Sequence, residues 1–147
     1  MLFRSQIADR ELAVVRKQLG WSEAELEAVL VDEQTRGPGN ALLLEIESEH
    51  ITELVSGFGQ VGVRAEAVAE RAVRELRRYL AAGVPVGPHL ADQLLLPLAL
   101  AGGGTFRTLP LSRHATTNID VIRSFLPVDV TVHTHHDATV TVEVRET

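Results

Sequence analysis

Cysteine is absent from the 147 residues, so the chain carries no disulfide, thiol nucleophile or thiolate metal site. No apolar run approaches the roughly 20 residues needed to cross a bilayer. The opening stretch MLFRSQIADRE also lacks the apolar core and cleavage site of a secretory signal. These absences predict a cytoplasmic protein with no membrane partner, and covalent catalysis in it would need a nucleophile other than cysteine.

Several enzyme signatures are missing as well. The chain has no G-x-x-x-x-G-K-[ST] phosphate loop, no G-x-G-x-x-G, no G-x-S-x-G and no H-E-x-x-H. Positive charge is scarce, because 14 Lys and Arg against 20 Asp and Glu give a formal net charge of −6. Broad nonspecific nucleic-acid binding is therefore disfavoured, and a bound nucleotide would need a site other than a P-loop.

One local basic row remains, formed by Arg64, Arg71, Arg74 and Arg78. Their spacings of 7, 3 and 4 place these arginines along one side of a helix. The row could be an RNA-binding stripe, or a solvated face on which glutamates four positions away form salt bridges. The second interpretation is favoured.

What the sequence does contain is a mixed order of helices and strands. Apolar spacing predicts helices over 8–19, 64–82, 89–101 and 117–126, the second burying Val68, Ala72, Leu76 and Leu80. Strands are predicted over 41–48, 51–59, 105–111, 128–135 and 138–146, the last two as an antiparallel pair. Ser22 and Glu25 fit a capping box, whereas 26–33 also suits a short buried strand, and 36–40 is a predicted turn. Two prolines and two glycines within 81–88 predict a domain junction.

His114 lies just ahead of one predicted helix. Thr117 and Asp120 have the spacing of a capping signature, so the helix should begin at about Asn118, with its free N–H groups facing the loop that carries His114. Such a helix start favours a phosphate and disfavours imidazolium, which leaves a neutral nitrogen able to attack or to accept a proton. His114 is thus a candidate for catalysis or phosphate binding, although these local features alone favour an ordinary surface histidine.

The segment HLADQ, residues 89–93, opens the helix after the predicted junction. Asp92 and Gln93 could hydrogen-bond a nucleotide. Ordinary charge placement in the first turn of a helix is the favoured interpretation of these two residues alone, and the motif taken singly is weak.

The segment HTHHD places His133 and His135 on one face of a predicted strand, with His136 and Asp137 at its end. Two histidines at this spacing can chelate a metal, but the sequence places no third ligand. A solvent-facing strand end near a hairpin is the favoured interpretation, so no metal site is predicted.

Four stretches, in order, resemble the carboxy-terminal part of the RNA 3′-terminal phosphate cyclases. They are GPGNALLLEIESEHITEL, AVRELRRYLAAGVPVGPHLADQLLLPLALAGGG, RHATTNIDVIRSFLP and the closing strand pair. The resemblance covers nearly the whole chain after about Ala8 and implies an α+β fold. A partial inserted α/β domain, incomplete at its amino end (1–84), would precede the last βαβαββ-type repeat of the catalytic domain (85–147). That repeat is related in the family to the carboxy-terminal domain of translation initiation factor 3.

The same resemblance implies ATP-dependent conversion of an RNA 3′-terminal phosphate to a 2′,3′-cyclic phosphate. In the family, a histidine attacks the α-phosphorus of ATP, AMP passes to the RNA 3′-phosphate, and the adjacent 2′-hydroxyl displaces AMP. The nucleophile falls on His114, and the nucleotide-contacting segment falls on His89, Leu90, Ala91, Asp92 and Gln93, with histidine where tyrosine is common. ATP and Mg²⁺ or Mn²⁺ are the implied cofactors. The implied partners are RNA with a 3′-terminal phosphate and the missing amino-terminal part of the cyclase.

A rival hypothesis is a non-catalytic RNA-binding or ribosome-assembly relative of the same family. Such relatives generally lack the nucleophilic histidine, so His114 favours the enzyme. Family members are roughly twice as long as this chain, and their amino-terminal part also contacts ATP, which weighs against activity of the 147 residues alone.

Overall fold

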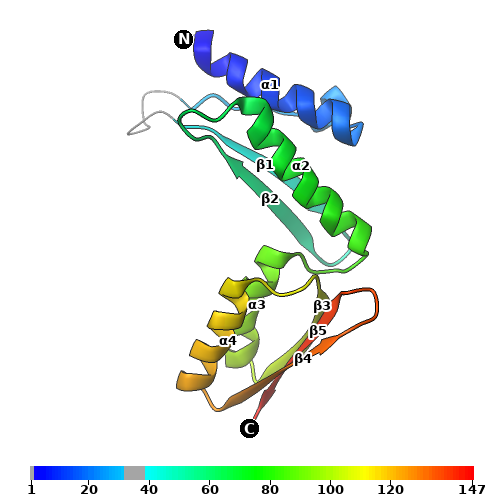
Figure 1. Ribbon diagram of the computed structural model, residues 1–147, viewed down its shortest axis with the longest axis vertical. Coiled ribbons are helices and arrows are strands. Elements are labelled where there is room, and N and C mark those ends of the chain that lie inside the picture. The colour runs from blue at the N-terminus through cyan, green and yellow to red at the C-terminus, as the bar shows by residue number, and fades with distance from the viewer. Residues whose placement is uncertain (1, 32–38) are drawn as a thin grey trace. The chain divides into compact units, whose positions relative to one another are not determined.

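The computed structural model describes residues 2–31 and 39–147, with side chains described from Gln6 onward. Its elements are α1 (Leu2–Leu19), the short 3₁₀ helix η1 (Glu23–Glu25), β1 (Ala41–Glu47), β2 (Thr52–Phe58), α2 (Ala65–Ala82), α3 (Pro88–Leu100), β3 (Gly103–Thr108), α4 (Arg113–Phe125), β4 (Val128–Thr134) and β5 (Val140–Glu146) (Figure 1). They divide into two compact units, Met1–Ile46 with Leu54–Arg78, and Glu47–Glu53 with Tyr79–Thr147.

The first unit packs a β1–β2 hairpin against α2. Burial alternates along both strands, as their period of two requires, and Leu44 and Val55 point inward. Gly57 lets the helix approach closely, because a Cβ there would lie 3.1 Å from Val68 Cγ1. The buried side of α2 ends on Tyr79, which is 5% exposed, and the prediction of a buried Leu80 is wrong because that side chain is 50% exposed. Leu80 lies three steps of four residues after Val68, and each step adds about 40° of rotation around the helix. The total of about 120° takes Leu80 off the buried face.

The start of the chain follows its sequence signals in part. Helix α1 begins six residues before the predicted Ala8 and ends as predicted at Leu19, where Gly20 adopts a φ of 74°. The capping box is confirmed, since Glu25 Oε2 accepts hydrogen bonds from Ser22 N–H (2.8 Å) and Ser22 Oγ (2.7 Å). Residues 26–31 form no strand. Most of the predicted 36–40 turn lies outside the described residues.

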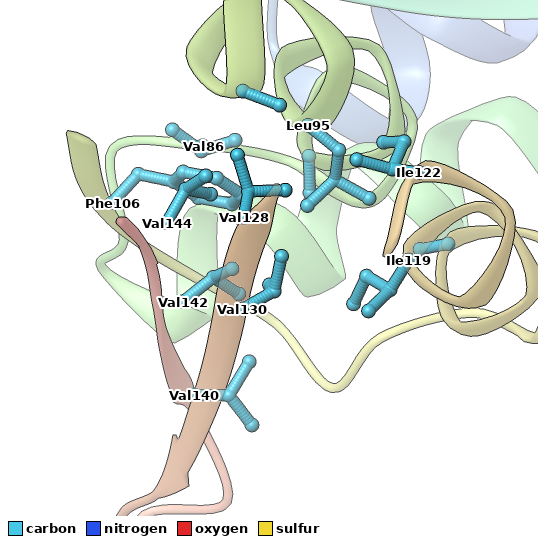
Figure 2. Close-up of a cluster of buried hydrophobic side chains, with 13 residues drawn as sticks. Val86, Leu95, Phe106, Ile119, Ile122, Val128, Val130, Val140, Val142 and Val144 are labelled. Atoms are coloured by element: carbon cyan, nitrogen blue, oxygen red, sulfur yellow. The ribbon is translucent and has the colours of Figure 1, made fainter. Parts of the chain in front are cut away.

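The second unit places α3 and α4 on one face of an antiparallel sheet with strand order β3–β5–β4 (Figure 1). The predicted antiparallel pairing of the last two strands is confirmed, with Val130 opposite Val144. Figure 2 shows the core, where Leu95 of α3 and Ile119 of α4 lie near the sheet valines. The alternation of apolar and polar residues in the strands produces this one-sided core.

A single parallel bridge joins Val86 to Thr108, next to β3. The order α3, β3, α4, β4, β5 makes the second unit a mixture of helices and strands. The α+β class is confirmed, whereas the assignment to a cyclase repeat and the 84/85 domain boundary stay predictions. Among the helices that the structure describes, none is long and apolar enough to cross a membrane.

Candidate nucleotide site

The start of α4 carries His114 in the first turn of the helix itself. Ser112 is the N-cap, and its Oγ accepts a hydrogen bond from Ala115 N–H at 3.1 Å. The prediction of a helix start near Asn118 is therefore wrong. Thr117 and Asp120 match the capping spacing, but Ser112 satisfies the helix start five residues earlier, and the helix continues through Thr117.

Because α4 begins at Arg113, His114 lies in its first turn and is nearer to the free N–H groups of the helix start than the sequence indicated. The first N–H groups of a helix have no partner within it. At α4 the N–H groups of Ala115 and Thr116 are satisfied by Ser112, which leaves those of Arg113 and His114 beside the exposed histidine side chain. An anion is stabilised at such a helix start by these donors and by the helix dipole.

The segment His89–Gln93 lies in the first turn and a half of α3. Gly87 is the N-cap and Pro88 opens the helix. His89 and Gln93 are exposed, and Leu90 and Asp92 are partly exposed. Ala91 is 1% exposed and packs in the core of the second unit, so its side chain faces away from solvent.

A pair of hydrogen bonds joins the two candidate segments. Asn118 Nδ2 of α4 donates to Asp92 Oδ1 at 3.0 Å and to the Asp92 carbonyl oxygen at 3.2 Å. Asn118 lies one turn after His114, on the same side of α4, and Asp92 lies one turn after the start of α3. The structure thus brings the beginnings of two parallel helices side by side, 25 residues apart in the chain from His89 to His114.

Sequence reasoning missed Asn118 and the residues that hold the start of α3. The signal for Asn118 was its position four residues after His114, which places both on one helix face. The signal for the other helix was the pair Gly87–Pro88, a helix start with no side chain able to cap it.

The histidine-rich strand end forms a network of its own. His135 Nε2 lies 2.7 Å from Thr141 Oγ1, and Asp137 accepts hydrogen bonds from Thr139 N–H and from Arg107 Nη2. The bonds from Thr139 are the main cause that lowers the pKa of Asp137. Across the described part of the chain, no three His, Asp or Glu side chains gather in a group able to hold a metal ion.

The basic row lies on and just before α2. Arg64, Arg71, Arg74 and Arg78 are all exposed. Arg64 Nε lies 3.4 Å from Glu66 Oε2. Both interpretations of the row, RNA-binding stripe and solvated face, stay predictions.

Sequence comparisons identify the family. Residues 3–81 match the family model of the RNA 3′-terminal phosphate cyclase (RTC) insert domain, which is more than half of the 147 residues. The chain belongs to the RNA 3′-terminal phosphate cyclase family. The resemblance seen in the four sequence stretches is therefore confirmed.

Curated relatives extend the similarity beyond the insert domain. An RNA 3′-terminal phosphate cyclase of Ectopseudomonas mendocina is 51% identical over 140 residues, which is 95% of this chain and 41% of the relative. Those of Pseudomonas fluorescens and Koribacter versatilis are 52% and 48% identical over 84% and 83% of this chain, and over 36% and 34% of their own length. The chain thus spans about two fifths or less of these cyclases.

Proposed function

We propose that this chain forms the carboxy-terminal part of an ATP-dependent RNA 3′-terminal phosphate cyclase. In this reaction a ring nitrogen of His114 attacks the α-phosphorus of ATP, and the bond to pyrophosphate breaks. The AMP on His114 then passes to the 3′-phosphate of an RNA end. Finally the adjacent 2′-hydroxyl attacks that phosphate, closes the 2′,3′-cyclic phosphate and releases AMP.

The single observation that supports this proposal most strongly is the pair of hydrogen bonds from Asn118 to Asp92. It holds the nucleophile's helix against the helix that bears the family's nucleotide-contacting segment. An attacking nitrogen and the bound nucleotide must be held together for covalent catalysis to gain from proximity. Neither segment alone would distinguish a nucleotide site from two ordinary helix starts.

Each group of the candidate site then has a separate task. The N–H groups of Arg113 and His114 can bind the phosphate under attack, because they point out of the start of α4. Asp92 can accept hydrogen bonds from the nucleoside, and Gln93 can accept or donate them. His89 can stack on adenine. Mg²⁺ or Mn²⁺ would be held by triphosphate oxygens and water, the oxygen ligands that these cations prefer.

The remaining part of the enzyme would come from the region that this chain lacks relative to its relatives. His114 lies at an exposed helix end, and neither of the two hollows found in the first unit includes it. We assign to the amino-terminal part the walls that would close the ATP site and exclude water. The assays therefore use a fusion protein in which the amino-terminal part of the Ectopseudomonas mendocina relative precedes this chain. We call this fusion the reconstituted enzyme.

The decisive experiment incubates this reconstituted enzyme with ATP labelled at the α-phosphate. We expect covalent label on the parent, and a loss of at least about a thousandfold in the His114→Ala variant, because no other imidazole lies in the first turn of α4. The matched control is His136→Ala, which removes another exposed histidine. Label that persists in His114→Ala would reject His114 as the nucleophile. RNA binding without any label in the parent would instead indicate a non-catalytic member of the family.

A further inference from the structure

The carboxylate of Glu53 is buried in the second unit. Glu53 lies at the beginning of β2 and is only 2% exposed. Its Oε2 accepts a hydrogen bond from Gly87 N–H at 2.9 Å. A carboxylate is rarely buried without such compensation, because its removal from water is costly. The placement therefore needs a reason beyond filling space.

Gly87 is shaped to receive this carboxylate. As the N-cap of α3 it has no side chain to satisfy the helix start, and Pro88 follows it. A Cβ at position 87 would lie 2.1 Å from Glu53 Oε1 and 2.4 Å from its Cδ, so only glycine leaves the necessary room. The carboxylate of Glu53 thus occupies the space of a side chain at position 87 and accepts a hydrogen bond from the N–H of the N-cap residue itself, one of the donors that a helix start leaves without an internal partner.

Tyr79 contacts the residues that lead into α3. Its hydroxyl donates to the carbonyl oxygen of Pro85 at 3.2 Å, two residues before Gly87. Burial, and then the charge of nearby Glu53, raise the pKa of Tyr79. Two buried side chains from outside α3 therefore determine where the helix begins.

We propose that Glu53 is a positioning residue that caps the start of α3 and thereby fixes the opening segment of this helix, which carries His89 and Asp92. This inference rests on the proposed function, since it assigns the nucleotide to that segment. Glu53 acts through Gly87 and touches neither substrate nor His114. Its loss should weaken ATP binding and leave the chemical step at His114 nearly unchanged, because α4 has its own cap in Ser112.

The claim that Glu53 caps α3 is tested by a double-mutant cycle on the chain itself. Gly87→Ala should lower Tm by on the order of 5 °C, because the new Cβ collides with the carboxylate. In a Glu53→Ala background the same substitution should cost much less, since the colliding group is gone. An equal loss in both backgrounds would refute the cap.

The claim that Glu53 supports ATP binding is tested by ATP-dependent labelling of the reconstituted enzyme. Glu53→Ala should raise KM for ATP about tenfold, the size expected for one lost charge-assisted hydrogen bond, with kcat changed less than about threefold. Glu53→Gln keeps an acceptor oxygen and should restore KM to within about threefold of the parent. The matched control Glu45→Gln removes an exposed carboxylate from β1 and should leave both parameters unchanged.

The outcomes separate this inference from the proposed function. A fall in kcat with no change in KM for Glu53→Ala would show a loss of folded enzyme only and would overturn the positioning role. If the parent acquires no label, the proposed function fails, and a role of Glu53 in ATP binding fails with it. The melting cycle still decides in that case whether Glu53 fixes the start of α3.

Discussion

The two helices of the second unit begin side by side but are capped in different ways. Helix α3 has no capping side chain of its own and receives the buried carboxylate of Glu53 at Gly87. Helix α4 is capped by its own Ser112 through a neutral hydroxyl. The positive end of α3 is therefore compensated by a negative charge, whereas that of α4 is not.

This difference divides the candidate site into two electrostatic halves. An anionic triphosphate is stabilised near the uncompensated end at His114 and is disfavoured near the carboxylate under α3. The uncharged nucleoside suits the α3 end, where Asp92 and Gln93 provide hydrogen-bonding groups. Under the proposed function, the comparison predicts that a nucleotide would bind with its phosphates toward α4.

The largest expected effect comes from making the two helix starts alike. Ser112→Asp keeps a good N-cap but places a carboxylate at the start of α4. We expect the rate of His114 labelling to fall about 10- to 100-fold, because the new charge repels the phosphate under attack. The measurement is single-turnover labelling of the reconstituted enzyme with α-labelled ATP.

Ser112→Asn is the matched control, since asparagine also caps helices but carries no charge. Its labelling rate should stay within about threefold of the parent. Equal loss in the aspartate and asparagine variants would show that shape matters here and charge does not.

A smaller effect is expected when the local cap is simply removed. Ser112→Ala leaves Ala115 N–H without its acceptor and should lower the free energy of unfolding by about 1 kcal/mol. Urea titration followed by circular dichroism measures this change. Because α3 is capped independently, Glu53→Ala and Ser112→Ala should have nearly additive effects on stability. Strong non-additivity would mean that the two helix starts form one cooperative unit.

The link between the helices should contribute somewhat less. Asn118→Ala removes both hydrogen bonds to Asp92 and should cost about 0.5–1 kcal/mol, because the pair is only partly buried. Thr117→Ala, one residue away on the exposed side of α4, serves as the control for helix propensity. Equal unfolding free energies for the two variants would show that the link contributes nothing to stability.

The sequence predicted what short-range patterns encode. Alternating residues predicted the β4–β5 pair, and apolar spacing predicted α3 despite Pro97. The start of α4 was misplaced because two serine or threonine residues compete as caps, and spacing alone cannot say which hydroxyl meets an N–H group. The contact between Glu53 and Gly87 joins positions 34 apart and forms only when the second unit folds. No local pattern encodes it, because a helix that begins with Gly-Pro does not indicate which distant group will meet its first N–H.

The start of α2, in the first unit, offers a third arrangement and the smallest expected effect. Its first turn contains Glu66, which accepts hydrogen bonds from Arg10 at 2.8 and 2.6 Å, and this pair holds the pKa of Glu66 at about 2. Because the folded pKa lies below the ordinary 4.5, the pair stabilises the fold above about pH 4.5 and loses this contribution as the pH falls toward 2. Glu66→Gln should therefore lower Tm slightly at pH 6, and the difference from the parent should shrink steadily at lower pH. Arg10→Gln should behave in the same way, and a Tm difference that stays constant from pH 6 to about 3 would show that the ion pair does not stabilise this helix start.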